Sequence, residues 1–83
     1  MFDFTAYDRT MCRRIRHYGM GMITDEEFME EAYKTLEATR IQVDRILIND
    51  GSLQEWSEAA ARLTKKHTAF ISCFEQMRKA LEA

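Results

Sequence analysis

The chain has 83 residues, of which 46% are hydrophobic and 31% are charged, and it contains three glycines and no proline. A chain of this length can form one small domain, and this composition favours long helices over sheets or disorder. The net charge of −2 argues against attraction of the whole protein to nucleic acid. We therefore expect a single all-α domain over residues 1–83.

The two cysteines, Cys12 and Cys73, lie far apart and outside any C-x-x-C spacing. This pattern predicts neither a disulfide framework nor a thiolate zinc site, and it favours a reduced, cytoplasmic setting. No charged-then-apolar leader follows Met1, and no apolar run approaches the roughly 20 residues that a membrane span requires. We expect neither secretion nor contact with a membrane.

Apolar side chains recur at helical spacing near the start of the chain, at Phe4, Tyr7, Met11, Ile15 and Tyr18. This periodicity predicts a helix over about residues 3–18. Gly19 is expected to end that helix in a left-handed conformation. The alternative is a mobile arm that becomes ordered only on a partner.

A second helix is predicted over about residues 25–48. Thr24 stands three residues before Glu27, which is the spacing of an S/T-x-x-E capping box. The apolar positions that follow are spaced alternately three and four apart: Met29, Ala32, Leu36, Thr39, Val43 and Ile46. This seam is widened by Phe28, Tyr33 and Leu47.

A third helix is predicted over about residues 53–82, where Ser52 and Glu55 repeat the capping-box spacing. Its seam alternates in the same way: Leu53, Trp56, Ala60, Leu63, His67, Phe70, Phe74, Met77 and Leu81. Heptad spacing of this kind favours coiled-coil-like packing. Since a short turn joins the two seams, we expect a long antiparallel helical hairpin, with the shorter first helix completing a three-helix bundle.

The first helix is too short to cover the whole hairpin. It spans about 24 Å at 1.5 Å per residue, against about 36 to 45 Å for the hairpin arms. We expect the half of the hairpin near its turn to stay uncovered: Val43, Ile46, Leu47, Trp56, Ala59 and Ala60. Because exposed apolar strips mark interfaces and closed twofold assemblies are the commonest solution, the sequence predicts a homodimer.

The sequence predicts no catalytic, cofactor-binding or metal-binding site. Neither histidine has a carboxylate or another histidine at the spacing that a helical metal site needs. His67 lies on the seam, where we expect it to bond Thr35, Thr39 or a backbone carbonyl, with a pH-sensitive switch as the alternative. Cys73 adjoins the seam and is expected to be a small buried hydrophobic residue.

Two charged clusters lead to alternative interpretations. Four arginines interleaved with Tyr7 and Tyr18 resemble a nucleic-acid-binding patch: Arg9, Arg13, Arg14 and Arg16. An acidic cluster could imitate nucleic acid and inhibit a protein that binds it: Asp25, Glu26, Glu27, Glu30 and Glu31. The simpler interpretations are that the two clusters pair with each other and that the acidic face is solvated and favoured by the helix dipole.

Our leading hypothesis is a non-enzymatic protein–protein interaction module. It would be a self-associating helical adaptor, or a small regulator or inhibitor of a larger complex. Its expected partners are a second copy of itself and another protein. A nucleic-acid-associated regulator, an acidic mimic and an enzyme subunit completed only in an oligomer are the alternatives.

Overall fold

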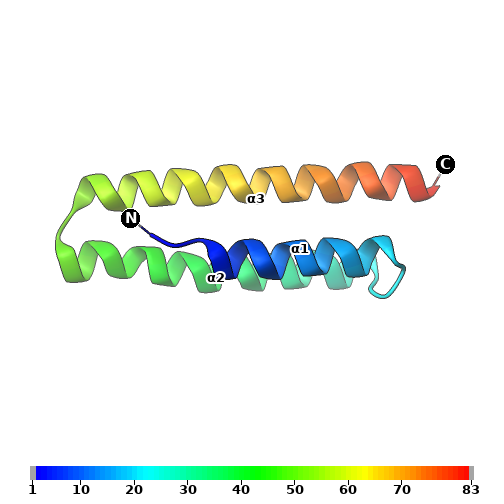
Figure 1. Cartoon of the computed structure of the whole chain (residues 1–83), viewed down its shortest axis with the longest axis horizontal. Coiled ribbons are helices and arrows are strands. Elements are labelled where there is room, and N and C mark those ends of the chain that lie inside the picture. The colour runs from blue at the N-terminus through cyan, green and yellow to red at the C-terminus, as the bar shows by residue number, and fades with distance from the viewer. Residues whose placement is uncertain (1, 83) are drawn as a thin grey trace.

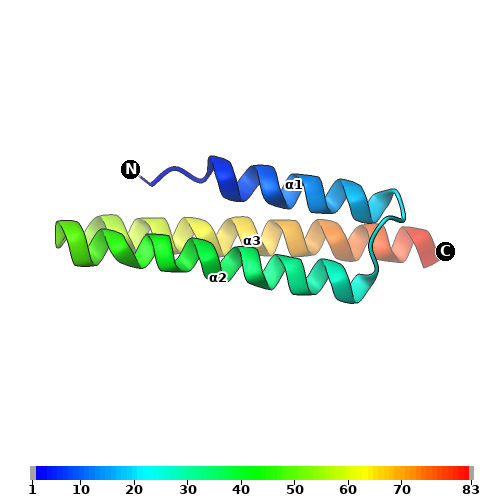
Figure 2. The ribbon, with the colours of Figure 1, turned by 90° about the horizontal axis from the view of Figure 1, so that it is seen from below.

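The structure, a computed structural model, describes residues 2–82, with the backbone alone at residue 50. Three helices follow one another in the chain: α1 (Thr5–Gly19), α2 (Asp25–Asp50) and α3 (Leu53–Glu82). They pack side by side into a rod of 49 × 18 × 17 Å, in which α1 and α3 run parallel and α2 runs antiparallel to both (Figures 1 and 2). The prediction of an all-α three-helix bundle is confirmed.

The ends of α2 follow from side-chain and backbone hydrogen bonds that the sequence encodes. Thr24 Oγ1 accepts from Glu27 N at 3.1 Å, and Glu27 Oε1 accepts from Thr24 N at 3.0 Å, which completes the expected capping box. At the other end Gly51 has a φ of 65° and donates its N–H to the carbonyl of Leu47. This left-handed conformation is one that glycine adopts without a steric cost.

Gly19 does not end α1 in a left-handed conformation, so that prediction is wrong. Gly19 is helical, and the residue with a φ of 73° is Gly21. A β-carbon placed on Gly19 would lie 2.6 Å from Cε of Met77, which belongs to α3. The glycine at position 19 therefore leaves room for the end of the Met77 side chain, and the turn is made at Gly21.

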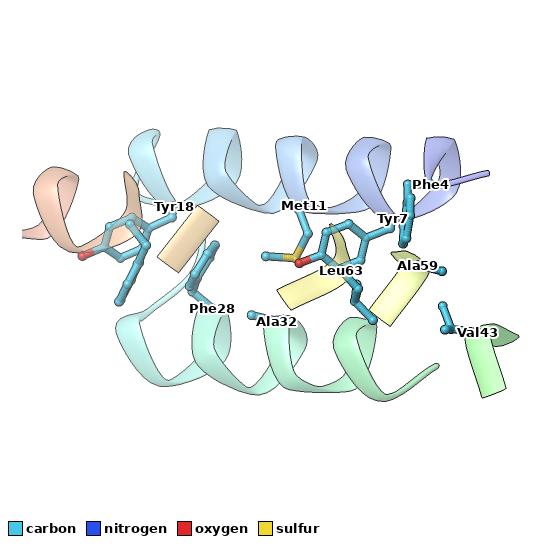
Figure 3. Close-up of a cluster of buried hydrophobic side chains, with 10 residues drawn as sticks. Phe4, Tyr7, Met11, Tyr18, Phe28, Ala32, Val43, Ala59 and Leu63 are labelled. Atoms are coloured by element: carbon cyan, nitrogen blue, oxygen red, sulfur yellow. The ribbon is translucent and has the colours of Figure 1, made fainter. Parts of the chain in front are cut away.

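The core follows the length of the bundle, and aromatic rings fill its end near the α1–α2 connection (Figure 3). The Phe28 and Phe74 rings stack with centroids 4.4 Å apart, and Tyr18 lies against Phe74 at 4.8 Å. Aromatic pairs in such arrangements add to the stability that burial of their area provides. The buried hydrophobic residues are Phe4, Tyr7, Met11, Tyr18, Phe28, Ala32, Val43, Ala59, Leu63 and Phe74.

The buried faces of α2 and α3 differ in part from the expected seams. On α2, Met29 and Tyr33 are exposed, whereas Phe28 is completely buried. On α3, the end positions Leu53 and Leu81 are exposed. Each helix in a three-helix bundle packs against two neighbours, so its buried face is centred on the direction between them. The seams expected for a two-helix hairpin therefore do not coincide with the buried faces.

The hairpin is covered further toward its turn than we expected. The chain before α1 continues along the hairpin, and Phe4 is buried at the level of Val43 and Ala59 (Figure 3). As a result Val43 is 2% exposed and Ala59 is 4% exposed. The expectation that these two residues stay uncovered is wrong, because it let the first segment, which already included Phe4, reach only about halfway along the hairpin.

Candidate functional site

Each pair of helices leaves a groove on the surface of the rod, and the three grooves differ in chemistry. The groove between α1 and α2 has a volume of about 290 Å³. Its lining is mixed: Thr10, Lys34, Thr35, Thr39 and Gln42 are polar, whereas Phe2, Ala6, Tyr7 and Ala38 are apolar or aromatic. Two of these hydroxyls are already used, since Thr35 donates to the Glu31 carbonyl at 2.7 Å and Thr39 to the Thr35 carbonyl at 2.8 Å.

The groove between α2 and α3 has a volume of about 360 Å³ and is bridged by a hydrogen bond. Trp56 Nε1 donates to Asp44 Oδ1 at 3.0 Å, which ties the indole of α3 to α2. Beside this bridge the lining includes Arg40, Thr64 and Thr68. Leu36, Val43, Ala60 and Leu63 also line it, so apolar and polar side chains share this groove about equally.

The groove between α1 and α3, which we call the cysteine groove, is the most apolar of the three, with a volume of about 680 Å³. From α1 it is lined by Asp8, Cys12 and Ile15, and from α3 by Lys66, Ala69, Phe70 and Cys73. Positions separated by three, four and seven residues lie on one side of a helix. Each wall of the cysteine groove is therefore a single helix face about two turns long.

The cysteine groove contains both thiols of the protein. Cys12 and Cys73 are free and exposed, so the expectation that Cys73 is buried is wrong. The parallel helices α1 and α3 make fewer contacts with each other than either makes with α2. Cys73 lies on the open side of α3, while its neighbour Phe74 faces the core. Within residues 2–82 there is no cluster of three or more His, Cys, Asp or Glu side chains that could hold a metal ion.

His67 pairs with a residue that the sequence did not indicate. Its Nδ1 lies 3.3 Å from Oη of Tyr7 on α1, so the expected partners Thr35 and Thr39 are wrong. Burial lowers the pKa of His67, and burial raises the pKa of Tyr7 to about 12. Both groups are therefore held in their neutral forms near pH 7.

The four arginines of α1 differ in their surroundings. Arg14 pairs with Glu31 of α2 at 3.4 Å. Across the described part of the chain, no carboxylate lies within 4.0 Å of Arg9, Arg13 or Arg16, and all three are exposed. The expected pairing between the arginines of α1 and the acidic cluster of α2 therefore consists of one ion pair among the described residues.

The tyrosines of the predicted basic and aromatic patch face the core instead of the solvent. Tyr7 and Tyr18 are buried, so they present no ring on which a base could stack. Tyr18 donates to Oδ1 of Asp25 at 2.7 Å, and this hydrogen bond raises the pKa of Tyr18 to about 12. The arginines and tyrosines thus lie on different faces of α1.

Most of the acidic cluster has partners within the protein. Asp25 bonds Tyr18, Glu27 belongs to the capping box, and Glu31 pairs with Arg14. Glu30 lies 3.1 Å from Lys34, one helical turn away, while Glu26 is exposed. Two of the five carboxylates, Glu30 and Glu31, are therefore paired with cations, which weakens the resemblance of the cluster to a phosphate backbone.

The residues of the predicted dimer interface differ in how far they are exposed to solvent. Val43 and Ala59 belong to the core, Ile46, Trp56 and Ala60 are half-buried, and Leu47 is exposed. Beside them, around the turn between α2 and α3, Ile48 is 78% exposed and Leu53 is 65% exposed. We call Leu47, Ile48 and Leu53 the hairpin tip.

Comparisons with known proteins identify no relative. No family model, no curated protein and no solved structure matches the chain. In the described part of the chain, none of the helices combines the length and the apolar character needed to cross a membrane.

Proposed function

We propose that this protein is a non-enzymatic protein–protein interaction module whose docking surface is the cysteine groove. The observation that supports the proposal is the contrast among the three grooves. Five of the seven residues that line the groove between α1 and α3 are apolar, namely Cys12, Ile15, Ala69, Phe70 and Cys73, a larger share than in either of the other grooves. An open apolar groove rimmed by polar groups is typical of a binding surface.

The shape of the cysteine groove favours a helix as its occupant. Two parallel helices form its walls, and each wall repeats with helical periodicity from Asp8 to Ile15 and from Lys66 to Cys73. An amphipathic helix laid between them would contact both walls with its own apolar stripe, as in other helix-in-groove complexes. The result would be a four-helix bundle, in which the apolar floor is removed from water.

A crosslinking experiment in living cells of the native host tests this function. A photoreactive amino acid replaces Ala69 in the cysteine groove, and a control variant has it at Glu75, an exposed residue two positions beyond Cys73 that does not line the groove. We expect a covalent adduct with a protein from position 69 and none from position 75. Equal adducts from both positions, or none from either, would contradict the proposal.

Self-association is a second candidate function, and the exposed hairpin tip favours it. Large apolar side chains at Leu47, Ile48 and Leu53 face solvent close to the half-buried Trp56. A twofold contact between two such tips would bury these side chains and extend the rod end to end. Sedimentation over the micromolar range tests this candidate, since the monomer has a mass of 9.8 kDa.

A further inference from the structure

The charges around the cysteine groove indicate what kind of helix it binds. We propose that its occupant is an amphipathic helix of another protein whose apolar stripe is flanked by Asp and Glu. This inference rests on the proposed function, since it names the partner class for the same groove.

The wall formed by α1 continues into cationic residues. Cys12 and Arg16 are separated by four residues and lie on the same side of the helix as Asp8. Arg9 follows Asp8 and borders the outer edge of that side. Both arginines are exposed, and within residues 2–82 neither has a carboxylate within 4.0 Å.

The wall formed by α3 continues in the same way. Lys65, Ala69 and Cys73 form a row at intervals of four residues, and Lys65 is exposed. Lys66 borders the same end of the groove, where its Nζ lies 3.0 Å from Oδ2 of Asp8. Lys66 therefore neutralises Asp8, the one acidic residue that lines the groove.

The rim of the groove consequently has an excess of positive charge. After the pair of Asp8 and Lys66 is set aside, Arg9, Arg16 and Lys65 remain without a carboxylate partner among the described residues. The protein as a whole has a net charge of −2, so this positive rim is local. Opposite charges on the two sides of an interface favour the correct partner and repel a basic one.

The same charges disfavour a second copy of this chain as the occupant. Two cysteine grooves that met face to face would bring Arg9, Arg16 and Lys65 of both copies together. The acidic cluster of a second copy lies on α2, which does not line the groove. If α2 of a second copy entered the groove, the groove of that second copy would stay open, and further copies would add head to tail without forming a closed assembly. A different protein satisfies the groove without either cost.

An apolar floor also distinguishes an acidic helix from nucleic acid. Phosphates bind cationic side chains and gain nothing from Ile15, Ala69 and Phe70. The tyrosines of α1 that could stack bases are buried. An amphipathic helix with acidic flanks would contact both the cations of the rim and the apolar floor of the groove.

Two designed peptides test the inference on the intact protein. Both have about 18 residues, a length of about 27 Å as a helix, and the same apolar stripe, but one has Glu and the other Lys at the flanking positions. Binding is measured by fluorescence anisotropy at low and high salt. We expect the acidic peptide to bind roughly 10-fold more tightly at low salt, as three exposed ion pairs would give, and this difference to shrink as salt screens them.

Charge-reversed variants and thiol protection make the test specific to the groove. In the double variant Arg9→Glu and Lys65→Glu the preference should pass to the basic peptide. Arg45→Glu, a single charge reversal on the exposed side of α2, should leave it unaltered. Bound acidic peptide should also slow the alkylation of Cys12 and Cys73 by iodoacetamide several-fold, since both thiols line the groove.

The outcomes separate this inference from the proposed function. If position 69 crosslinks to a protein in cells but the two peptides bind equally, the interaction function stands and the acidic partner is refuted. Binding of a DNA duplex that the double variant abolishes, without binding of either peptide, would also refute it. If neither crosslinking nor peptide binding occurs, both proposals fail.

Discussion

Phe28 of α2 and Phe74 of α3 stack almost parallel, with ring centroids 4.4 Å apart and an angle of 6° between the ring planes. Tyr18 of α1 packs against Phe74 with an angle of 57° between the rings, so all three helices meet at this point. Arg78 lies over the Phe74 ring, with its Cζ 5.8 Å from the ring centroid. The cluster fixes the bundle at the end where α1 turns into α2.

Phe74→Ala should lower the free energy of unfolding by about 3–5 kcal/mol, since it removes a buried ring and leaves a cavity. Leu81→Ala provides the control, because Leu81 is 62% exposed at the end of the same helix. Urea unfolding followed by circular dichroism measures both variants. Equal losses of stability would mean that the aromatic cluster does not anchor the bundle.

Stability should fall as the pH drops below about 6.5, the pKa of histidine in an unfolded chain. Burial lowers the pKa of His67 in the folded state, so the unfolded state binds more protons just below this pH. The contribution is fully present above about pH 6.5 and is lost as the pH falls toward the folded pKa. Tyr7 and His67 face each other between α1 and α3, while Arg40 and Asp44 line the adjoining groove from α2.

Thermal melts at a series of pH values between about 5 and 8 test the role of His67. His67→Gln should flatten the dependence in this range, whereas His17→Gln, which removes the other histidine, should retain it. A slope that survives in His67→Gln would assign the effect to a different group.

Gly51→Ala should destabilise the protein by about 1–2 kcal/mol, because an L side chain is strained at a φ of 65°. Gly19→Ala should change stability by less than about 1 kcal/mol, since alanine is the better helix former and only the terminal methyl of Met77 must move. The two variants insert the same methyl group and are compared in one denaturation series. The opposite order would contradict the backbone conformations of the two glycines.

Ile48→Glu should weaken self-association by about 30-fold, which corresponds to a loss of 2 kcal/mol, if the hairpin tip is the contact between copies. Ile41→Glu places the same charge on another exposed isoleucine of α2, away from the tip, and serves as the control. Sedimentation velocity across a dilution series measures the mass of each variant, and the emission of Trp56 reports changes near the tip. A wild type that sediments at 9.8 kDa throughout would exclude the dimer.

The sequence is sufficient to predict where each helix begins and ends, but not the register in which the helices pack against one another. The capping box of Thr24 and Glu27 and the glycine at position 51 act over a few residues, and the observed helices begin and end within two residues of the predicted bounds. Local hydrogen bonds and backbone conformation determine such boundaries, so a single sequence contains the necessary information.

The candidate site was missed because it depends on the register between α1 and α3. Cys12 and Cys73 are 61 positions apart in the sequence, and no local pattern indicates that they share a groove. The register is set by long-range pairs such as Tyr7 with His67 and Asp8 with Lys66. The one available signal was the i, i+4, i+7 spacing of Asp8, Cys12 and Ile15 beside the core positions of the same helix.

The up-down-up arrangement has a consequence for the order of assembly. Both antiparallel contacts join helices that are neighbours along the chain, and the weaker parallel contact between α1 and α3 is the one that closes a long loop. Chains with mainly local contacts fold quickly, and segments with few contacts open first in the native state. Amide protons of α1 should therefore exchange with solvent before those in the middle of α3, by an opening in which the first helix lifts away while the hairpin persists.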